Sequence, residues 1–242
     1  MNAQARFGTM ISEIGFAGLP VIIQNAGFDF LILDLEHGAF DYSSVRAVID
    51  AARAVGVKAI LRLPDNGRRE IIRLGDIGAD GFVLPMAESA ADVEQVVRYA
   101  KYAPEGARGI SMTRAHSGYN PGDLAGYMAK ANQNMAIYAQ AETRKGLDKL
   151  SEILAVKYLD GVILGPNDLS ADLNCIGDRA PVLKAMETLS EASRKAGKPA
   201  GIITGDKTLL DKARALGYGL VCVSTELNIL SQGYKNLRQS LT

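Results

Sequence analysis

Ionisable side chains follow several apolar segments of this 242-residue chain, at the point where each segment ends. They are Asp34, Glu36 and His37 after one segment, and Arg62, Glu142 and Asp168 after three later ones. When parallel strands carry their chemistry at their carboxyl ends, the natural architecture is an α/β barrel, whose catalytic face is built from the loops after the strands. Residues far apart in the sequence would then meet in one site.

Glu142 and Asp168 are the best candidates for metal ligands. Carboxylates at adjacent strand ends can present hard oxygen atoms to Mg²⁺ or Mn²⁺ and leave coordination positions for substrate and water. Each residue also has a structural interpretation, because Glu142 could pair with Arg144 or Arg62, and Asp168 could cap a turn. The occurrence of both at neighbouring strand ends favours a metal site.

Arg62 and His37 are candidates for anion binding and proton transfer. The guanidinium of Arg62 is expected to point into the barrel mouth and to grip a carboxylate with two hydrogen bonds; the alternative is an internal salt bridge with a strand-end acid. His37 follows Glu36, and Asp34 could face the same side of the strand as Glu36. Carboxylate support would suit a general acid or base near neutral pH, whereas the alternative is a hydrogen-bonded surface histidine.

Two polar loops could add substrate contacts. The turn from Gly165 to Ser170 could offer backbone N–H groups to an anion, although it is neither a Walker loop nor a dinucleotide-binding motif. The connection from Ala107 to Asp123 is long for a compact domain, and such loops are more often functional than accidental. Its segment from Arg108 to Asn120 is expected to be a lid, a second substrate contact or a solvated loop.

Composition favours one domain that acts on small molecules. The chain is 48% apolar and 22% charged, as in soluble globular proteins, and its length is close to the roughly 250 residues of a single α/β barrel. Its 27 basic residues balance 27 acidic ones, which argues against nucleic acid or a membrane surface as partner. Without a membrane-spanning run or a signal peptide's apolar segment, a cytoplasmic location is expected. Cys175 and Cys222 match no metal-ligand spacing and are interpreted as reduced thiols.

Strands and helices are predicted to alternate from end to end, which gives eight strand and helix pairs and a single (β/α)₈ TIM barrel over residues 1–242. The expected strands are 7–14, 28–35, 58–63, 81–85, 135–141, 159–164, 199–203 and 219–224. The expected helices are 19–26, 43–55, 68–77, 89–102, 124–131, 147–155, 181–196, 208–216 and a terminal helix. Gly56, Gly78, Gly197 and Gly217 follow helical segments, where a left-handed residue commonly ends the helix.

Six separated motifs resemble the HpcH/HpaI family of class II, metal-dependent pyruvate aldolases. They are Asp34-Leu35-Glu36-His37-Gly38, Arg62, Gly78-Ala79-Asp80-Gly81 with Leu84-Pro85-Met86, Arg108-Gly109, Gln140-Ala141-Glu142-Thr143 and Gly165-Pro166-Asn167-Asp168-Leu169-Ser170. The likeness covers nearly the whole chain in the right order. It implies a (β/α)₈ barrel, a homohexamer with an exchanged terminal helix, and a divalent ion, Mg²⁺, Mn²⁺ or Co²⁺, held by Glu142 and Asp168.

The resemblance also implies roles for the substrate-binding residues. Pyruvate would chelate the metal, Arg62 would bind the pyruvyl oxygens and Gln140 would assist. The backbone of Gly165, Pro166 and Asn167 would receive the substrate carboxylate.

Proton transfer is the remaining role that the resemblance implies. During cleavage of a 4-hydroxy-2-oxo acid to pyruvate and an aldehyde, a base near His37 would accept the proton of the 4-hydroxyl. Asp34, or Asp76 of a neighbouring subunit, would support that base.

Some segments depart from the family pattern and leave other functions open. Asn174 stands where the family often has Gly, and Ser224-Thr225-Glu226 replaces a more common Gly-Ser/Val-Asp pattern. The loop around Arg114 and His116 resembles a subgroup with siderophore-associated citrate synthases, which condense acetyl-CoA with oxaloacetate. A synthase in which Arg114 and His116 bind substrate is therefore the second hypothesis, and a barrel without catalysis is the third.

Overall fold

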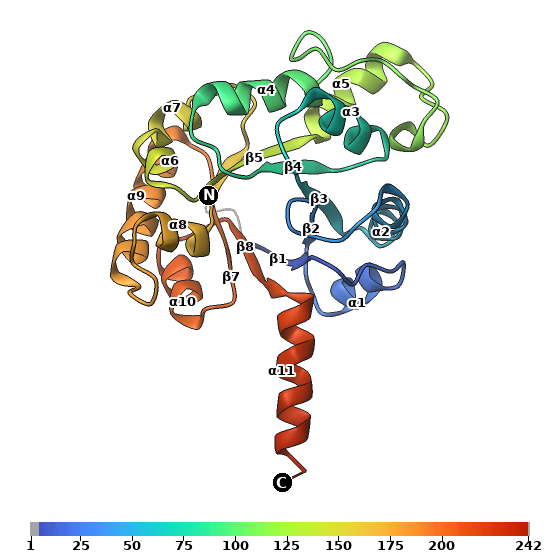
Figure 1. Ribbon diagram of the computed structural model, residues 1–242. Coiled ribbons are helices and arrows are strands. Elements are labelled where there is room, and N and C mark those ends of the chain that lie inside the picture. Colours follow the sequence, from blue (N-terminus) through green and yellow to red (C-terminus); the bar gives the residue numbers. More distant parts are fainter. Residues whose placement is uncertain (1–4, 242) are drawn as a thin grey trace.

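The computed structural model describes residues 5–241 and shows eight parallel strands closed into a barrel, with helices around it (Figure 1). Each strand pairs with the next, and β8 pairs with β1. The predicted (β/α)₈ barrel is confirmed; residues 1–4 and 242 of the predicted domain lie outside the described residues. The strands are β1 (Arg6–Ile11), β2 (Phe30–Asp34), β3 (Lys58–Arg62), β4 (Gly81–Leu84), β5 (Ala136–Ala141), β6 (Gly161–Leu164), β7 (Ala200–Thr204) and β8 (Leu220–Thr225).

The helices begin and end largely where local signals predict. Gly56, Gly78, Gly197 and Gly217 all have positive φ angles just after a helix, as expected. Asp41 and other polar residues accept backbone N–H bonds at helix starts. The helical segments are α1 (Leu19–Asn25), α2 (Tyr42–Val55), α3 (Arg68–Asp76), α4 (Ala90–Ala100), the 3₁₀ turn η1 (Ala115–Ser117), α5 (Leu124–Asn134), α6 (Arg144–Asp148), α7 (Leu150–Leu154), α8 (Pro166–Asp172), α9 (Ala180–Ala196), α10 (Lys207–Ala215) and α11 (Glu226–Gln239).

The alternation of side chains along each strand decides which residues enter the barrel. One apolar cluster, which includes Ile32 and Ile60, fills the barrel interior, while their neighbours Leu33 and Leu61 belong to the cluster between the sheet and the helices. Residues two positions beyond an interior residue face the interior again. Asp34 and Arg62 follow Ile32 and Ile60 by two positions, and Gln140 likewise follows the interior residue Tyr138. Strand geometry therefore brings polar side chains to the carboxyl end of the barrel.

Three expected elements differ from the structure. A single helix over 147–155 was expected, but Thr143 accepts a hydrogen bond from the N–H of Gly146 and starts α6 early; the chain then leaves helical geometry at Lys149, before α7. Pro166 opens α8 in a segment interpreted as a turn, because proline fits the first position of a helix. β1 was expected to reach Ile14 and instead ends at Ile11.

The last helix, α11, projects away from the barrel (Figure 1). Apart from Glu226, the α11 side chains within the described residues are not buried. Large apolar side chains on this helix are consequently exposed, including Leu230, Tyr234 and Leu237. No helix within residues 5–241 is both long and apolar enough to cross a membrane.

Candidate active site

A cavity of about 260 Å³ lies at the carboxyl ends of the barrel strands. Most of the residues predicted for the site line it. They are Asp34, His37, Arg62, Gln140, Gly165, Pro166, Asn167 and Asp168. Residues from four different strand ends or following loops are thus brought together, as the barrel topology requires.

Asp34 and Arg62 form a buried, bidentate ion pair at the floor of this cavity. Arg62 donates from Nε to Oδ1 of Asp34 at 2.9 Å and from Nη2 to Oδ2 at 2.6 Å. Its Nη1 lies 3.2 Å from Oε2 of Glu36. Burial alone would lower the pKa of Arg62 and raise that of Asp34, but their hydrogen bonds and charges outweigh burial and shift both pKa values the other way. Both groups are therefore charged, and the guanidinium is held in one orientation.

Glu142 is buried beside the lining residues Gln140 and Gly165 and does not itself line the cavity. Its Oε1 accepts a hydrogen bond from the N–H of Met86 at 2.7 Å, and its Oε2 accepts one from Nε2 of Gln140 at 2.5 Å. Burial raises the pKa of Glu142, and the charge of Asp168 raises it further. A Cβ at Gly165 would collide with Oε2 of Glu142, so glycine is needed for this close approach.

His37 is held through its backbone, and its ring is largely free. Its N–H donates to Oδ1 of Asp34 at 3.3 Å, and its ring Nε2 lies 3.9 Å from Oε2 of Glu36. The side chain of His37 is 69% exposed. Asp34 thus fixes the backbone at His37, and its carboxylate is directed toward Arg62 rather than the imidazole.

The acidic groups at this end of the barrel suit a hard divalent cation. Glu142 interacts electrostatically with both Asp168 and Glu36. These three carboxylates concentrate negative charge, and Arg62 is the positive side chain that partly balances it. Oε1 of Gln140 is buried and has no hydrogen-bond partner within residues 5–241, so a bound group or water is needed there. No group of three or more His, Cys, Asp or Glu side chains that could hold a metal occurs in the described part of the chain. Glu142 and Asp168 fit an ion that also takes oxygen atoms from substrate and water.

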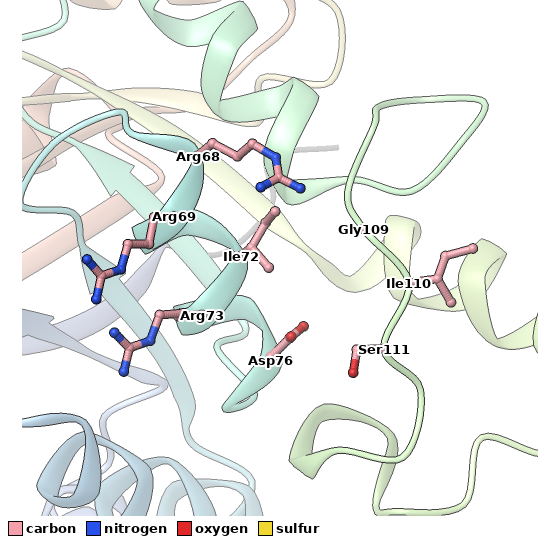
Figure 2. Close-up of a pocket in the computed structure, with 8 residues that line it drawn as sticks. All are labelled: Arg68, Arg69, Ile72, Arg73, Asp76, Gly109, Ile110 and Ser111. Atoms are coloured by element: carbon pink, nitrogen blue, oxygen red, sulfur yellow. The ribbon is translucent and has the colours of Figure 1, made fainter.

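Asp76, Arg114 and His116 lie elsewhere in this chain. Figure 2 shows Asp76 at the end of α3, beside the loop that carries Ser111, in a second pocket of about 320 Å³. Oδ1 of Asp76 accepts a hydrogen bond from Arg108 at 2.7 Å and lies 3.7 Å from Nε2 of His116.

The two other predicted residues of this region are occupied by local contacts. Nδ1 of His116 is 2.5 Å from the hydroxyl of Tyr127, and Nε of Arg114 donates to Oγ of Ser111 at 3.0 Å. Neither Asp76, Arg114 nor His116 lines the cavity at the strand ends. Their roles in catalysis or binding stay predictions.

The sequence interpretation missed the wall of the cavity formed by the carboxyl ends of β7 and β8, the loop after β1 and the start of α11. That wall contains Ser12, Thr204, Gly205, Ser224, Thr225 and Asn228. These are small neutral residues, which carry no chemical signal in a sequence. Glu226, whose buried carboxylate lies next to this wall, differs in the sequence only by its departure from a common family pattern.

Comparison with known proteins places the chain in a family. The family model for HpcH/HpaI aldolase/citrate lyase matches residues 19–231. The chain belongs to this family. A hydroxypyruvate/pyruvate aldolase from Roseovarius nubinhibens is 35% identical over 213 residues, which cover 87% of this chain and 82% of that protein. As an HpcH/HpaI member with such relatives, the protein is a carbon–carbon lyase.

Solved structures of similar proteins share the whole fold. The HpcH/HpaI aldolase from Desulfitobacterium hafniense superimposes with a TM-score of 0.94 and 30% identity, over 98% of this chain and 93% of that one. The citrate synthase SbnG gives a TM-score of 0.84 and 26% identity, over 98% and 92% of the two chains. The same barrel therefore occurs in proteins named as aldolase and as synthase.

Proposed function

We propose that this protein is a class II aldolase that reversibly cleaves a 4-hydroxy-2-oxo acid to pyruvate and an aldehyde. The observation that carries the proposal is the cavity lined by the buried Arg62–Asp34 pair and by Asp168, with the buried carboxylate of Glu142 close enough to interact electrostatically with Asp168 and Arg62. A cation and an oxo acid carboxylate need these opposite charges within one small space. The likeness to a pyruvate aldolase from Roseovarius nubinhibens supports this choice of substrate class.

In this proposal the chain's own residues bind and orient the oxo acid. Arg62 binds the pyruvyl oxygens, and Asp34 holds its guanidinium at the required angle through two hydrogen bonds. Gln140 assists, and the backbone from Gly165 to Asn167 at the start of α8 receives the carboxylate.

Glu142 and Asp168 would hold a divalent ion, Mg²⁺, Mn²⁺ or Co²⁺. When bound, such an ion acts as a Lewis acid that stabilises the negative charge of the pyruvate enolate. The raised pKa of Glu142 falls when a cation compensates its charge, so the carboxylate is ionised in the loaded site.

Proton transfer at the 4-hydroxyl is assigned to His37, which lines the cavity and has an exposed side chain. We further propose that the protein is a homo-oligomer, by family resemblance a hexamer, in which a second copy covers the apolar side chains of α11. In that assembly Asp76 of a neighbouring copy would support His37. A cytoplasmic location stays a prediction.

Proton NMR of pyruvate in D₂O tests the proposed function. The methyl signal is followed with the metal-free protein, before and after addition of Mg²⁺ or Mn²⁺. Metal-dependent loss of the signal is expected, because enolisation exchanges the methyl protons with solvent deuterium. The variant Glu142→Gln should lose this exchange, whereas Glu152→Gln, on the outer helix α7, is the matched control and should retain it. Absence of exchange under every condition would reject the aldolase.

A citrate-synthase-like condensation of acetyl-CoA with oxaloacetate is the second candidate, and the fold shared with SbnG favours it. It predicts that acetyl-CoA and oxaloacetate are consumed together while pyruvate does not exchange. Arg114→Ala would then abolish condensation. In the aldolase, the same substitution is expected to spare pyruvate exchange, because Arg114 contacts Ser111 and does not line the cavity.

A further inference from the structure

We propose that Glu226 is a positioning residue that fixes the loop carrying His37 and thereby sets the rate of proton transfer. This inference rests on the proposed aldolase function. It concerns a carboxylate that lies at the first position of α11 and is 6% exposed, although α11 itself projects from the barrel.

The carboxylate of Glu226 binds three successive backbone amides of the loop after β1. Its Oε1 accepts hydrogen bonds from Ser12 at 2.9 Å, Glu13 at 2.7 Å and Ile14 at 3.0 Å, and its Oε2 accepts a second one from Ser12 at 3.0 Å. Hydrogen bonds to an ionised acceptor are about twice as strong as those between neutral groups. This contact explains why β1 ends at Ile11, since the next three amides turn toward Glu226 rather than continue the sheet.

The end of β8 is irregular in a way that directs Glu226 toward β1. Gly8 pairs with Cys222 but Met10 pairs with Thr225, so β8 contains one extra residue at this point. Ser224 lies in this bulge with a φ of 60°. Such a bulge bends the strand and turns the following side chains, and bulges are common beside active sites. Strained backbone at a non-glycine residue persists only where its surroundings hold it.

The loop that Glu226 holds is bonded in turn to the loop after His37. The carbonyl of Ser12 accepts a hydrogen bond from the N–H of Ala39 at 3.0 Å. Gly38 packs so closely that a Cβ there would lie 2.6 Å from the same carbonyl oxygen. The backbone around His37 is thus held at two points. Asp34 accepts the N–H of His37 itself, and Glu226 holds Ser12, whose carbonyl accepts the N–H of Ala39.

The exposed ring of His37 makes this support necessary. Because its ring has no close hydrogen bond to a carboxylate, its place over the cavity depends on the backbone on either side of it. Displacement of a catalytic group by 1 Å can lower a rate about 100-fold. Loss of the Glu226 carboxylate should therefore slow the chemical step more than it weakens binding of the oxo acid at Arg62.

The test measures cleavage of a 4-hydroxy-2-oxo acid by the full-length, metal-loaded protein and its variants. Glu226→Ala should lower kcat by between about 10-fold and 100-fold with little change in KM. Glu226→Gln keeps the side-chain volume and one acceptor oxygen, and should give a smaller loss in a protein that folds normally. The matched control is Asp29→Ala, which removes a carboxylate that accepts the N–H of Phe7 at the opposite end of β1 and should cleave like the unaltered protein.

A double-mutant cycle separates positioning from a merely structural role. If Glu226 acts through His37, Glu226→Ala should change the residual rate of His37→Ala less than about twofold, because coupled residues are not additive. An equal loss in both backgrounds would overturn the proposal, as would wild-type kcat in both Glu226 variants.

Backbone amide hydrogen exchange gives a readout that does not depend on activity. Glu226→Ala should speed exchange at Ser12, Glu13 and Ile14, and also at Ala39, which Glu226 does not touch. Unchanged protection of Ala39 would disprove the connection to the His37 loop. The two proposals can fail separately. If the unaltered protein neither exchanges the methyl protons of pyruvate nor cleaves oxo acids, the proposed function is wrong. Faster amide exchange at Ala39 in Glu226→Ala would still support the connection between the two loops.

Discussion

Asp34 and Arg62 are directly opposite each other on β2 and β3, and their side chains meet inside the barrel through two hydrogen bonds. The nearest alternative partner of the guanidinium is Glu36, at 3.2 Å from Nη1. The Nε and Nη2 edge of the Arg62 guanidinium is therefore occupied by Asp34. In the proposed function, a substrate carboxylate would compete only with the more exposed Glu36, whose pKa burial raises.

Removal of Asp34 should strongly destabilise the fold. Asp34→Ala leaves the buried guanidinium of Arg62 without its main partner, which is expected to lower the free energy of unfolding by about 3 kcal/mol. Urea denaturation measures this loss. As a control, Glu191→Ala breaks an exposed pair with Lys195 and should leave the unfolding free energy nearly unchanged. Equal midpoints for the two variants would contradict a structural role for the buried pair.

The same carboxylate should make stability depend on pH in the acid range. The pKa of Asp34 is lowered in the folded protein relative to its value of about 3.9 in an unfolded chain. The unfolded state then binds more protons, so this contribution is present above pH 3.9 and is lost as pH falls through the lowered pKa. Subtracting the unfolding free energy of Asp34→Asn from that of the unaltered protein isolates the effect. The difference should be constant near neutral pH and shrink in acid; a flat difference throughout would reject the lowered pKa.

Metal affinity should depend on both predicted ligands. Glu142→Gln and Asp168→Asn should each weaken Mn²⁺ binding by more than about 100-fold. Loss of a residue that only supports a ligand weakens metal binding by up to about 100-fold, and loss of a direct ligand should cost more. Isothermal titration calorimetry measures this, with Glu152→Gln as the surface control. Affinity of the unaltered protein should decline as pH falls, because protons compete for Glu142, whose pKa burial raises. Mn²⁺ binding that survives both substitutions would place the ion elsewhere.

A lysine at position 62 should not replace the arginine. Arg62→Lys keeps the charge but loses the planar fork that binds Asp34 and an oxo acid together. Loss of one charge-assisted hydrogen bond, about 1.5 kcal/mol, should raise KM for the oxo acid at least about tenfold. Steady-state kinetics provide the measurement, and Arg214→Lys on the outer helix α10 serves as the control. An unchanged KM would show that Arg62 acts only as a partner of Asp34.

Charges on α11 should reduce the size of the proposed oligomer. Leu230→Glu together with Tyr234→Glu places two carboxylates on an exposed apolar helix, and burial of such charges against a second copy would be costly. Analytical ultracentrifugation should show a smaller assembly than for Gln232→Glu, which alters a polar side chain of the same helix. If the unaltered protein sediments as a monomer, the oligomer proposal is wrong.

Strand order and the floor of the site could be predicted because they depend on local patterns. Apolar runs that end in Asp34 or Arg62 predict strands, and the alternation of side chains places both residues inside the barrel. The sequence allows a salt bridge between Arg62 and a strand-end acid as an alternative to substrate binding; the structure shows the pair with Asp34, and substrate binding stays a prediction.

The remaining features depend on contacts between distant segments. Nothing near Ile11 in the sequence indicates that β1 stops there, because the carboxylate responsible belongs to Glu226. The break at Lys149 between α6 and α7 is likewise invisible to helical periodicity. The distance of His116 from the cavity follows from packing against Asp76 and Tyr127, which no spacing rule predicts.

The contact between Ser12 and Glu226 joins residues 214 positions apart. During synthesis on the ribosome, β1 is translated long before its partner strand β8 and the carboxylate of Glu226. These two contacts of β1 therefore form late. Such non-local contacts fold slowly, and incomplete barrels expose unpaired strand edges. A nascent chain that has made the Asp34–Arg62 pair and contains the predicted ligands Glu142 and Asp168 consequently still lacks the wall of the cavity until β7, β8 and the start of α11 have been translated.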